Sequence, residues 1–266
     1  MDSRRTRPWS GTPRTGRRVL ECAARSNVSR VYSELGGKST FIVFPDCADL
    51  DLAARTAAAM FFNQGESCNA PSRVLVRESL AADFVHRLAA ETPRYVPEGP
   101  LNELTVMGAM VDEAHMNSVL DCVQPGRREG AQLATAGRRV RIASGGFYVE
   151  LTIFDHVHMG MRIARGEIFG TVMSVLRFQE EADAVAQANA GSFGLQASLW
   201  TQDRDRAHRM ASALRVGTAH VNEYDQDDMT VPFGGVGQSG NGRDKSLHAL
   251  ELYTELKTTW LRLRAA

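Results

Sequence analysis

The sequence predicts an α/β fold with a largely parallel sheet, and three observations support this class. Short apolar runs alternate with helical patterns along most of the chain. The 266 residues are 43% hydrophobic and 23% charged, which is an ordinary globular mixture. The formal net charge is zero, so the chain lacks the basic excess that is typical of nucleic-acid binders. No run of 18 apolar residues occurs, so we expect no membrane span and no membrane partner.

The predicted elements begin with a buried strand at residues 41–44, which ends at Pro45. Asp49 then favours a helix start, and apolar residues at helical spacing predict a helix over residues 50–61 that ends by Gly65. Further strands are expected at 73–77, 172–178, 195–200 and 218–222, and further helices at 80–88, 113–123, 181–189 and 204–214. We expect a charged loop over 126–137 and a last β segment at 258–263. Strands separated by helices favour a parallel sheet.

The arginine-rich first 20 residues allow two interpretations. Six arginines stand there against the single acid Asp2. They could form a transit peptide or a nucleic-acid-binding arm, but Pro8 and Pro13 interrupt the pattern and favour a solvated chain end. The four cysteines lie far apart without a C-x-x-C pair, so we expect no disulfide framework, no metal site and a reduced, cytoplasmic setting.

Two short segments have the composition of a reactive site. Glu34-Leu-Gly-Gly-Lys38 places two adjacent glycines before the first clear strand, where they allow close approach of a flat ligand. Phe62-Asn-Gln-Gly-Glu-Ser-Cys68 ends the alanine-rich helix in a turn that can expose a thiol. A lone cysteine is more often a small core residue, so the second segment gains weight from its pairing with the first.

In this order and spacing the segments resemble the aldehyde dehydrogenase superfamily. The 34-residue step from Glu34 to Cys68 matches the family's general base and nucleophile. The resemblance runs from about Trp9 to Leu263 and includes the following further stretches: Glu167-Ile-Phe-Gly170, Ala188-Asn189, residues 217–222 and Pro232-Phe-Gly-Gly235. It implies the aldehyde dehydrogenase catalytic domain together with a remnant of the cofactor-binding domain.

The resemblance also implies a mechanism and a cofactor. Cys68 would attack an aldehyde, and Glu34 would activate the water that hydrolyses the resulting thioester. NAD or NADP would be the cofactor. The residues implied to bind it are Gly11, Thr12, Leu35, Gly36, Glu167 and Phe169.

The segment from Asn222 to Leu250 closely resembles bacterial γ-glutamyl-γ-aminobutyraldehyde dehydrogenases of putrescine breakdown. This implies an aminoaldehyde substrate, with Asp225, Asp228 and Phe233 at its binding site. An acidic cluster there would favour a substrate that bears an amine. A solvated acidic loop is an equally good interpretation of the same residues.

The family's chains are about twice this long, and the resemblance places the start of this one late in the cofactor domain. We expect a cofactor-domain remnant at 1–34, a catalytic domain at 35–235, and a return segment with an oligomerisation strand at 236–266. Three functions stay open: an aldehyde dehydrogenase that forms a homo-oligomer, a silent fragment that associates with full-length relatives, and a cofactor-free cysteine esterase. Several positions also depart from the family's pattern, namely Glu66, Gly166, Thr171, Leu151 and Val236-Gly237.

Overall fold

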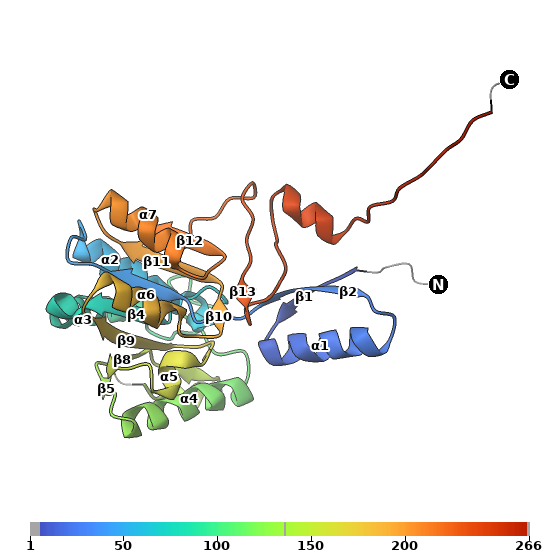
Figure 1. Cartoon of the computed structure of the whole chain (residues 1–266). Coiled ribbons are helices and arrows are strands. Elements are labelled where there is room, and N and C mark those ends of the chain that lie inside the picture. The colour runs from blue at the N-terminus through green and yellow to red at the C-terminus, as the bar shows by residue number, and fades with distance from the viewer. Residues whose placement is uncertain (1–5, 136, 265–266) are drawn as a thin grey trace.

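The computed structural model describes residues 6–135 and 137–264. Its centre is a seven-stranded sheet of order β12-β11-β3-β4-β9-β8-β5, in which every neighbouring pair is parallel except β5 with β8 (Figure 1). The predicted largely parallel sheet is therefore confirmed. The strands are β3 (Thr40–Val43), β4 (Arg73–Arg77), β5 (Gln132–Leu133), β8 (Thr152–Val157), β9 (Val172–Phe178), β11 (Gln196–Trp200) and β12 (Thr218–Val221).

Helices cover both faces of this sheet and give it two separate cores. On one face, alternate strand residues such as Phe41 and Val43 pack against α2 (Leu50–Ala58) and α3 (Ala81–Ala90). On the other face, residues such as Ile42 belong to a cluster with four helices: α4 (Glu113–Arg128), α5 (Arg162–Arg165), α6 (Glu181–Asn189) and α7 (Arg204–Ala213). Period-two alternation explains how one four-residue strand serves both cores.

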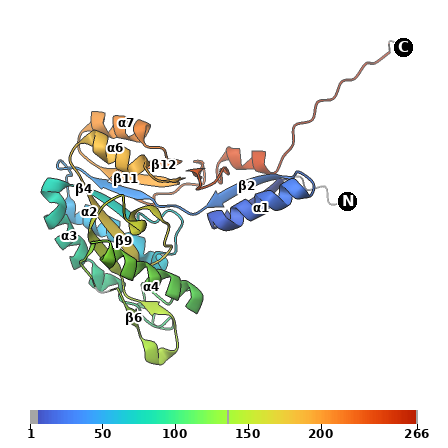
Figure 2. The same cartoon turned by 60° about the horizontal axis from the view of Figure 1, so that its bottom comes forward.

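A smaller unit lies beside this body, as Figure 2 shows. In it β1 (Thr6–Gly11) pairs in parallel with β2 (Arg30–Leu35), and α1 (Pro13–Arg25) connects them. Thr12 caps α1 by accepting the N–H of Thr15, and Gly16 lets the helix approach Leu35 closely. The boundaries at residues 34 and 235 stay a prediction.

The sequence-based element bounds need several corrections. The helix expected over 50–61 ends at Ala58 and continues as a 3₁₀ segment, and the loop expected over 126–137 contains β5. The helix expected to end near Val123 continues to Arg128, because Pro125 and Gly126 are accommodated in its last turns, where Gly126 packs against Phe154 and Ile163. Residues 258–263, expected as a β segment, form no strand within this chain and run away from the body as an extended tail (Figure 1). A strand needs a partner for its backbone, and the described residues offer this tail none. The oligomerisation strand expected within 236–266 stays a prediction.

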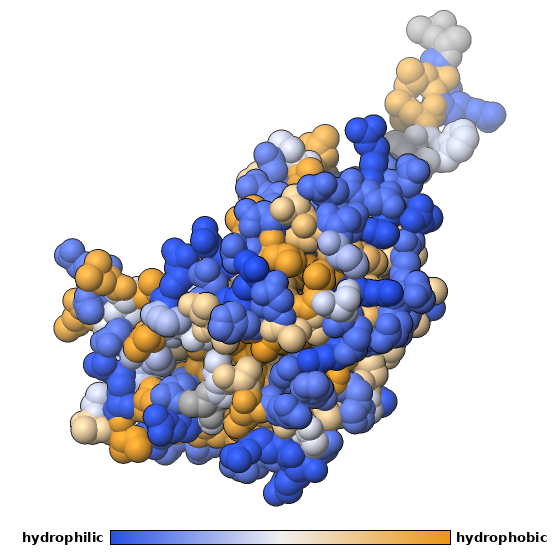
Figure 3. Space-filling model, turned by 90° about the vertical axis from the view of Figure 1, so that its left-hand side faces the viewer, coloured by the Kyte–Doolittle hydropathy of each residue, from blue (hydrophilic) through white to orange (hydrophobic). Residues whose placement is uncertain are grey.

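The remaining elements are short. They include two antiparallel ladders of two-residue strands, β6 (Arg139–Val140) on β7 (Tyr148–Val149) and β10 (Phe193–Gly194) on β13 (Val236–Gly237). No helix within the described ranges is long and apolar enough to cross a membrane. Figure 3 shows hydrophobic side chains scattered among hydrophilic ones over one face of the molecule. Arg4 and Arg5 of the arginine-rich segment lie outside the described residues.

Candidate active site

The predicted site residues gather at one edge of the sheet, the edge where the parallel strands begin. Glu34 and Gly36 precede β3, Cys68 precedes β4, and Glu167 precedes β9. Three segments that are distant in sequence therefore meet because neighbouring parallel strands start side by side.

The loop that carries Cys68 has an unusual backbone. It follows a 3₁₀ segment over Ala59–Gly65, in which Asn63 and Gln64 have φ of 50° and 59°. Left-handed conformations at residues other than glycine are uncommon and need support from their surroundings. That support includes the side chain of Gln64, whose Oε1 accepts the N–H of Gly108 at 2.8 Å. A Cβ at Gly65 would lie 2.4 Å from the carbonyl oxygen of Gly170, so the loop packs directly on the Glu167–Gly170 segment.

Glu34 lies at the end of β2 with both carboxyl oxygens buried and without a hydrogen-bond partner among the described side chains. Its Oε1 lies against Gly234 and Gly242, where any Cβ would crowd it. Burial, and after it the negative charge of Asp244, raises the pKa of Glu34 to about 8. A carboxyl group with a pKa near neutral pH is suited to general-base chemistry.

Cys68 lies within the electrostatic reach of Glu34 and Glu167. Burial raises the pKa of its thiol, and the charges of Glu34 and Glu167 raise it further against the lowering effect of nearby backbone N–H groups. The chain at Gly37 also touches this residue, since a Cβ there would lie 2.5 Å from the carbonyl oxygen of Cys68. The structure thus brings the predicted nucleophile and the predicted base into one site.

Glu167 is held against the two-glycine segment. Its Oε1 accepts the N–H of Gly37 at 3.0 Å, and a Cβ at Gly36 would lie 2.0 Å from both of its carboxylate oxygens. Burial raises the pKa of Glu167. The nearby Lys38 is buried, and the described residues offer its amine no hydrogen-bond partner. Burial, followed by the charge of Arg73, lowers its pKa to about 7.

Phe169, two residues further on, is 40% exposed and has a φ of 55°. His115 links its segment to the cysteine loop, since Nε2 lies 2.6 Å from the carbonyl oxygen of Phe169 and 3.4 Å from Glu66 Oε1. Glu66, which departs from the family's pattern, accepts the N–H of Val111 with the same oxygen. The loop carrying the nucleophile and the loop carrying Glu167 are therefore connected through α4.

The other residues expected to bind a cofactor lie on the smaller unit. Gly11 and Leu35 are direct partners across the β1–β2 ladder, and Thr12 follows at the N-terminus of α1. Helix N-termini present free backbone N–H groups that suit phosphate oxygens. Of the residues expected to bind a cofactor, Gly11, Thr12 and Leu35 thus lie on the smaller unit, while Glu167 lies within the electrostatic reach of Cys68.

A cavity of about 210 Å³ opens at Cys68, and two of the three residues expected to bind substrate line it, Asp225 and Phe233. Asp228 does not line it; its carboxylate caps Thr230 instead, accepting the backbone N–H at 2.7 Å. Asp227 lines the cavity and is paired with Lys245.

Sequence reasoning missed three polar residues of the site. Asn69 donates to Asp225 Oδ1 at 2.5 Å and so fixes that acid beside the thiol. Asp244 raises the pKa of Glu34 from more than 200 residues away in sequence. Lys38 is the third. It could have been found from the sequence, because it is the last residue of the Glu34–Lys38 segment. Asp244 gave no local signal, since only the return of the chain to β2 at Gly240 brings it close.

Among the described residues, no cluster of three or more His, Cys, Asp or Glu could hold a metal ion.

Known proteins share both this sequence pattern and this arrangement. Residues 9–259 match the aldehyde dehydrogenase family. The NADP/NAD-dependent aldehyde dehydrogenase PuuC of Escherichia coli is 47% identical over 258 residues, which are 97% of this chain and 51% of that protein. The solved γ-glutamyl-γ-aminobutyraldehyde dehydrogenase of Burkholderia cenocepacia superimposes with a TM-score of 0.93 at 49% identity and covers 97% of this chain and 52% of its own.

A third similar protein is the indole-3-acetaldehyde dehydrogenase AldA of P. syringae, solved in complex with NAD+. It superimposes with a TM-score of 0.94 at 46% identity, covering 96% of this chain and 52% of that one. The chain belongs to the aldehyde dehydrogenase family. It spans about half the length of the curated relatives that it matches.

Proposed function

We propose that this chain carries the thiol chemistry of an NAD(P)-dependent oxidation of an aminoaldehyde to a carboxylic acid. The observation that carries the proposal is that Cys68, which lines the cavity, lies within the electrostatic reach of the buried carboxyl of Glu34, for which the described residues offer no hydrogen-bond partner. A nucleophile beside a carboxyl whose pKa is raised to about 8 can alternate between covalent attack and base-assisted hydrolysis.

The chemistry of these residues runs in two stages. Cys68 loses its proton, and its sulfur bonds to the aldehyde carbon to give a thiohemiacetal. Oxidation of that carbon gives a thioester, and ionised Glu34 then removes a proton from the water that attacks it. The carbon–sulfur bond breaks, the acid is released, and the Cys68 thiolate is regenerated. The backbone N–H of Cys68 is suited to stabilise the oxyanion.

The residues of this chain fit the nicotinamide end of a dinucleotide. When bound, the cofactor supplies the acceptor for the hydride that leaves the thiohemiacetal carbon. Glu167 would hold the ribose, since Oε1 is occupied by Gly37 while Oε2 has no partner among the described residues. The absence of a Cβ at Gly36 keeps the space against this carboxylate open. Gly11, Thr12 and Leu35 would lie along the phosphates, and Phe169 beside the ring.

An amine on the substrate is supported by the acids at the cavity. Asp225 and Asp227 line it, and Phe233 supplies an apolar wall. Lys245 already neutralises Asp227, so Asp225 is the acid that we propose for recognition of the amine.

The proposed function is tested by combining purified chain, NAD(P)+ and an aminoaldehyde, and following the reduced nicotinamide spectroscopically. We expect production of reduced cofactor that is lost in Cys68→Ala and kept in the matched variant Cys22→Ala, whose exposed cysteine lies on α1. Absence of turnover with every aldehyde and both cofactors would leave the chain as a silent member of its family.

Hydrolysis of an activated ester is a second candidate function. It needs Cys68 and Glu34 but no nicotinamide, and both residues lie within this chain. We expect turnover of p-nitrophenyl acetate without cofactor. If Cys68→Ala leaves this turnover unchanged, the esterase hypothesis is wrong.

A further inference from the structure

A second, larger cavity adjoins the one at Cys68. It measures about 520 Å³, and two residues, Ser67 and Asp225, line both cavities. A molecule whose reactive carbon lies at Cys68 can therefore extend past Ser67 and Asp225 into this space. The first cavity alone holds about 210 Å³, so a longer substrate must use the second.

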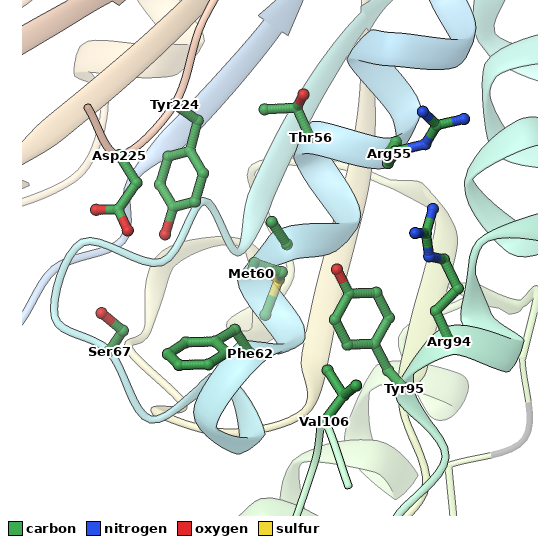
Figure 4. A pocket seen from close by; sticks show the side chains of 11 residues that line it. Arg55, Thr56, Met60, Phe62, Ser67, Arg94, Tyr95, Val106, Tyr224 and Asp225 are labelled. Carbon is green, nitrogen blue, oxygen red and sulfur yellow. The ribbon is translucent and has the colours of Figure 1, made fainter. Parts of the chain in front are cut away.

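The second cavity is polar at its two ends and largely apolar between them. Figure 4 shows Asp225 and Ser67 at one end, and Arg55 and Arg94 together at the other. Between these ends lie mainly apolar and aromatic side chains: Ala59, Met60, Phe62, Tyr95, Val106 and Tyr224. Burial raises the pKa of Tyr95 and of Tyr224, so both phenols stay neutral.

The arginine end carries an excess of positive charge. Arg55 Nε lies 3.6 Å from Glu91 Oε1, and Arg94 NH1 lies 3.1 Å from Glu91 Oε2. Two guanidinium groups thus share a single carboxylate. Both arginine side chains remain more than half exposed, at 55% and 59%, so each keeps donors free for another anion.

We propose that Arg55 and Arg94 form a carboxylate-binding subsite for a substrate that carries its aldehyde at one end and a carboxylate at the other. An apolar or peptide-like linker would cross the middle of the cavity, with any amine near Asp225. The inference deepens the proposed function and rests on Cys68 as the reactive end. Guanidinium pairs recognise carboxylates through paired hydrogen bonds, which gives the subsite geometric as well as electrostatic selectivity.

The test compares two pairs of thiol-alkylating reagents. The long pair is N-iodoacetyl-6-aminohexanoate and its carboxamide, and the short pair is iodoacetate and iodoacetamide. In each pair, the rate of Cys68 alkylation by the carboxylate reagent is divided by the rate for the carboxamide reagent. This ratio isolates the effect of the carboxylate. Only the long reagent has the reach to place its carboxylate beyond Ser67.

We expect the double variant Arg55→Gln/Arg94→Gln to lower the ratio of the long pair about fivefold to tenfold, since two exposed charge pairs are lost. The ratio of the short pair should stay unchanged. The matched control Arg18→Gln/Arg127→Gln removes the same charge from exposed positions on α1 and α4 and should change neither ratio. An unchanged long-pair ratio, or an equal fall in the short pair or the control, would overturn the subsite.

Calorimetric titration with 6-acetamidohexanoate gives a second measurement that needs no reaction at Cys68. We expect heat of binding for the wild type and the control variant, and its loss in Arg55→Gln/Arg94→Gln. Equal binding by all three proteins would refute the subsite. Failure of Cys68 to react with any reagent, with binding intact, would instead count against the proposed function.

Discussion

The two edges of the parallel sheet treat acidic side chains in opposite ways. At the edge where the strands begin, neither buried carboxyl oxygen of Glu34 has a hydrogen-bond partner among the described residues. At the edge where they end, Asp46 follows β3 and accepts hydrogen bonds from Thr201 Oγ1 and Arg206 NH1, both at 2.7 Å, and from Asp203 N at 3.0 Å. One carboxyl group is left unsatisfied while the other is fully bonded.

The pKa values follow this difference. Burial and Asp244 raise the pKa of Glu34 to about 8. At Asp46 burial acts in the same direction, but the hydrogen bonds from Thr201 and Asp203 and the charge of Arg206 outweigh it and lower the pKa. The bonded acid connects β3, β11 and α7, while the unbonded one keeps the capacity to take up a proton. Unsatisfied buried groups in a native fold mark functional sites more often than structural ones.

The largest expected effect that separates the two acids is on turnover. Replacing Glu34→Gln removes the base and should lower ester or aldehyde turnover on the order of a hundredfold or more. Asp46→Asn, as the matched control, keeps the base and should leave turnover within about twofold when measured well below its melting temperature. Steady-state kinetics of both variants decide this, and equal losses would remove the distinction between the edges.

The free energy of unfolding should be affected in the reverse order, with the larger loss in Asp46→Asn. Asp46→Asn loses a charged acceptor and should destabilise the fold by about 1.5–3 kcal/mol in urea unfolding at pH 8. Glu34→Gln should be neutral or stabilising at that pH, because burying its ionised form opposes folding.

The dependence of stability on pH gives the sign of each contribution. The folded-state pKa of Glu34 is raised, so its favourable contribution is complete below its ordinary value of 4.5 and is lost as the pH rises towards about 8. The pKa of Asp46 is lowered, so its contribution is present above its ordinary value of 3.8 and is lost as the pH falls through the lower folded-state value. In the wild type and in Asp46→Asn, the midpoint of urea unfolding should fall as the pH rises towards about 8. In Glu34→Gln this fall should disappear. A decline that persists in this variant would contradict the assignment to Glu34.

The smallest expected effect concerns the thiol itself. The charge of Glu34 adds to the effect of burial in raising the pKa of Cys68, so Glu34→Gln should move the pH profile of iodoacetamide alkylation to lower pH. Asp46→Asn should leave the profile in place. Peptide mass spectrometry that quantifies alkylated Cys68 at each pH provides the measurement, and a shift to higher pH would contradict the charge argument.

Much of the central sheet could be predicted from local pattern. Residues 73–77 and 172–178 are strands and 181–189 are a helix with the expected bounds, because each contains apolar residues at one clear period. Residues 258–263, expected as a strand, form none within this chain, since alternating apolar residues indicate a strand only where a neighbour supplies hydrogen bonds. The resemblance implied a cofactor-domain remnant at 1–34, but its elements β1, α1 and β2 were not predicted, because the helix is rich in arginine.

The candidate site divides in the same way. Glu34, Cys68 and Glu167 lie in short segments whose composition could be recognised, and the structure brings them together. The partners that tune them were not predictable from local sequence, because Asp244 and Asn69 act through tertiary contacts. Asp228 seemed equivalent to Asp225 in the acidic run, yet the turn at Thr230 directs its carboxylate away from the cavity.

The pairing of Cys68 with Glu34 is tested most directly by trapping the acylated enzyme. After a pulse of p-nitrophenyl acetate, Glu34→Gln should accumulate an acetyl group on Cys68 that intact-mass and peptide analysis detect, while the wild type and Asp46→Asn release it rapidly. An acetyl group that fails to accumulate in Glu34→Gln, or that resides on another residue, would contradict the account of this site.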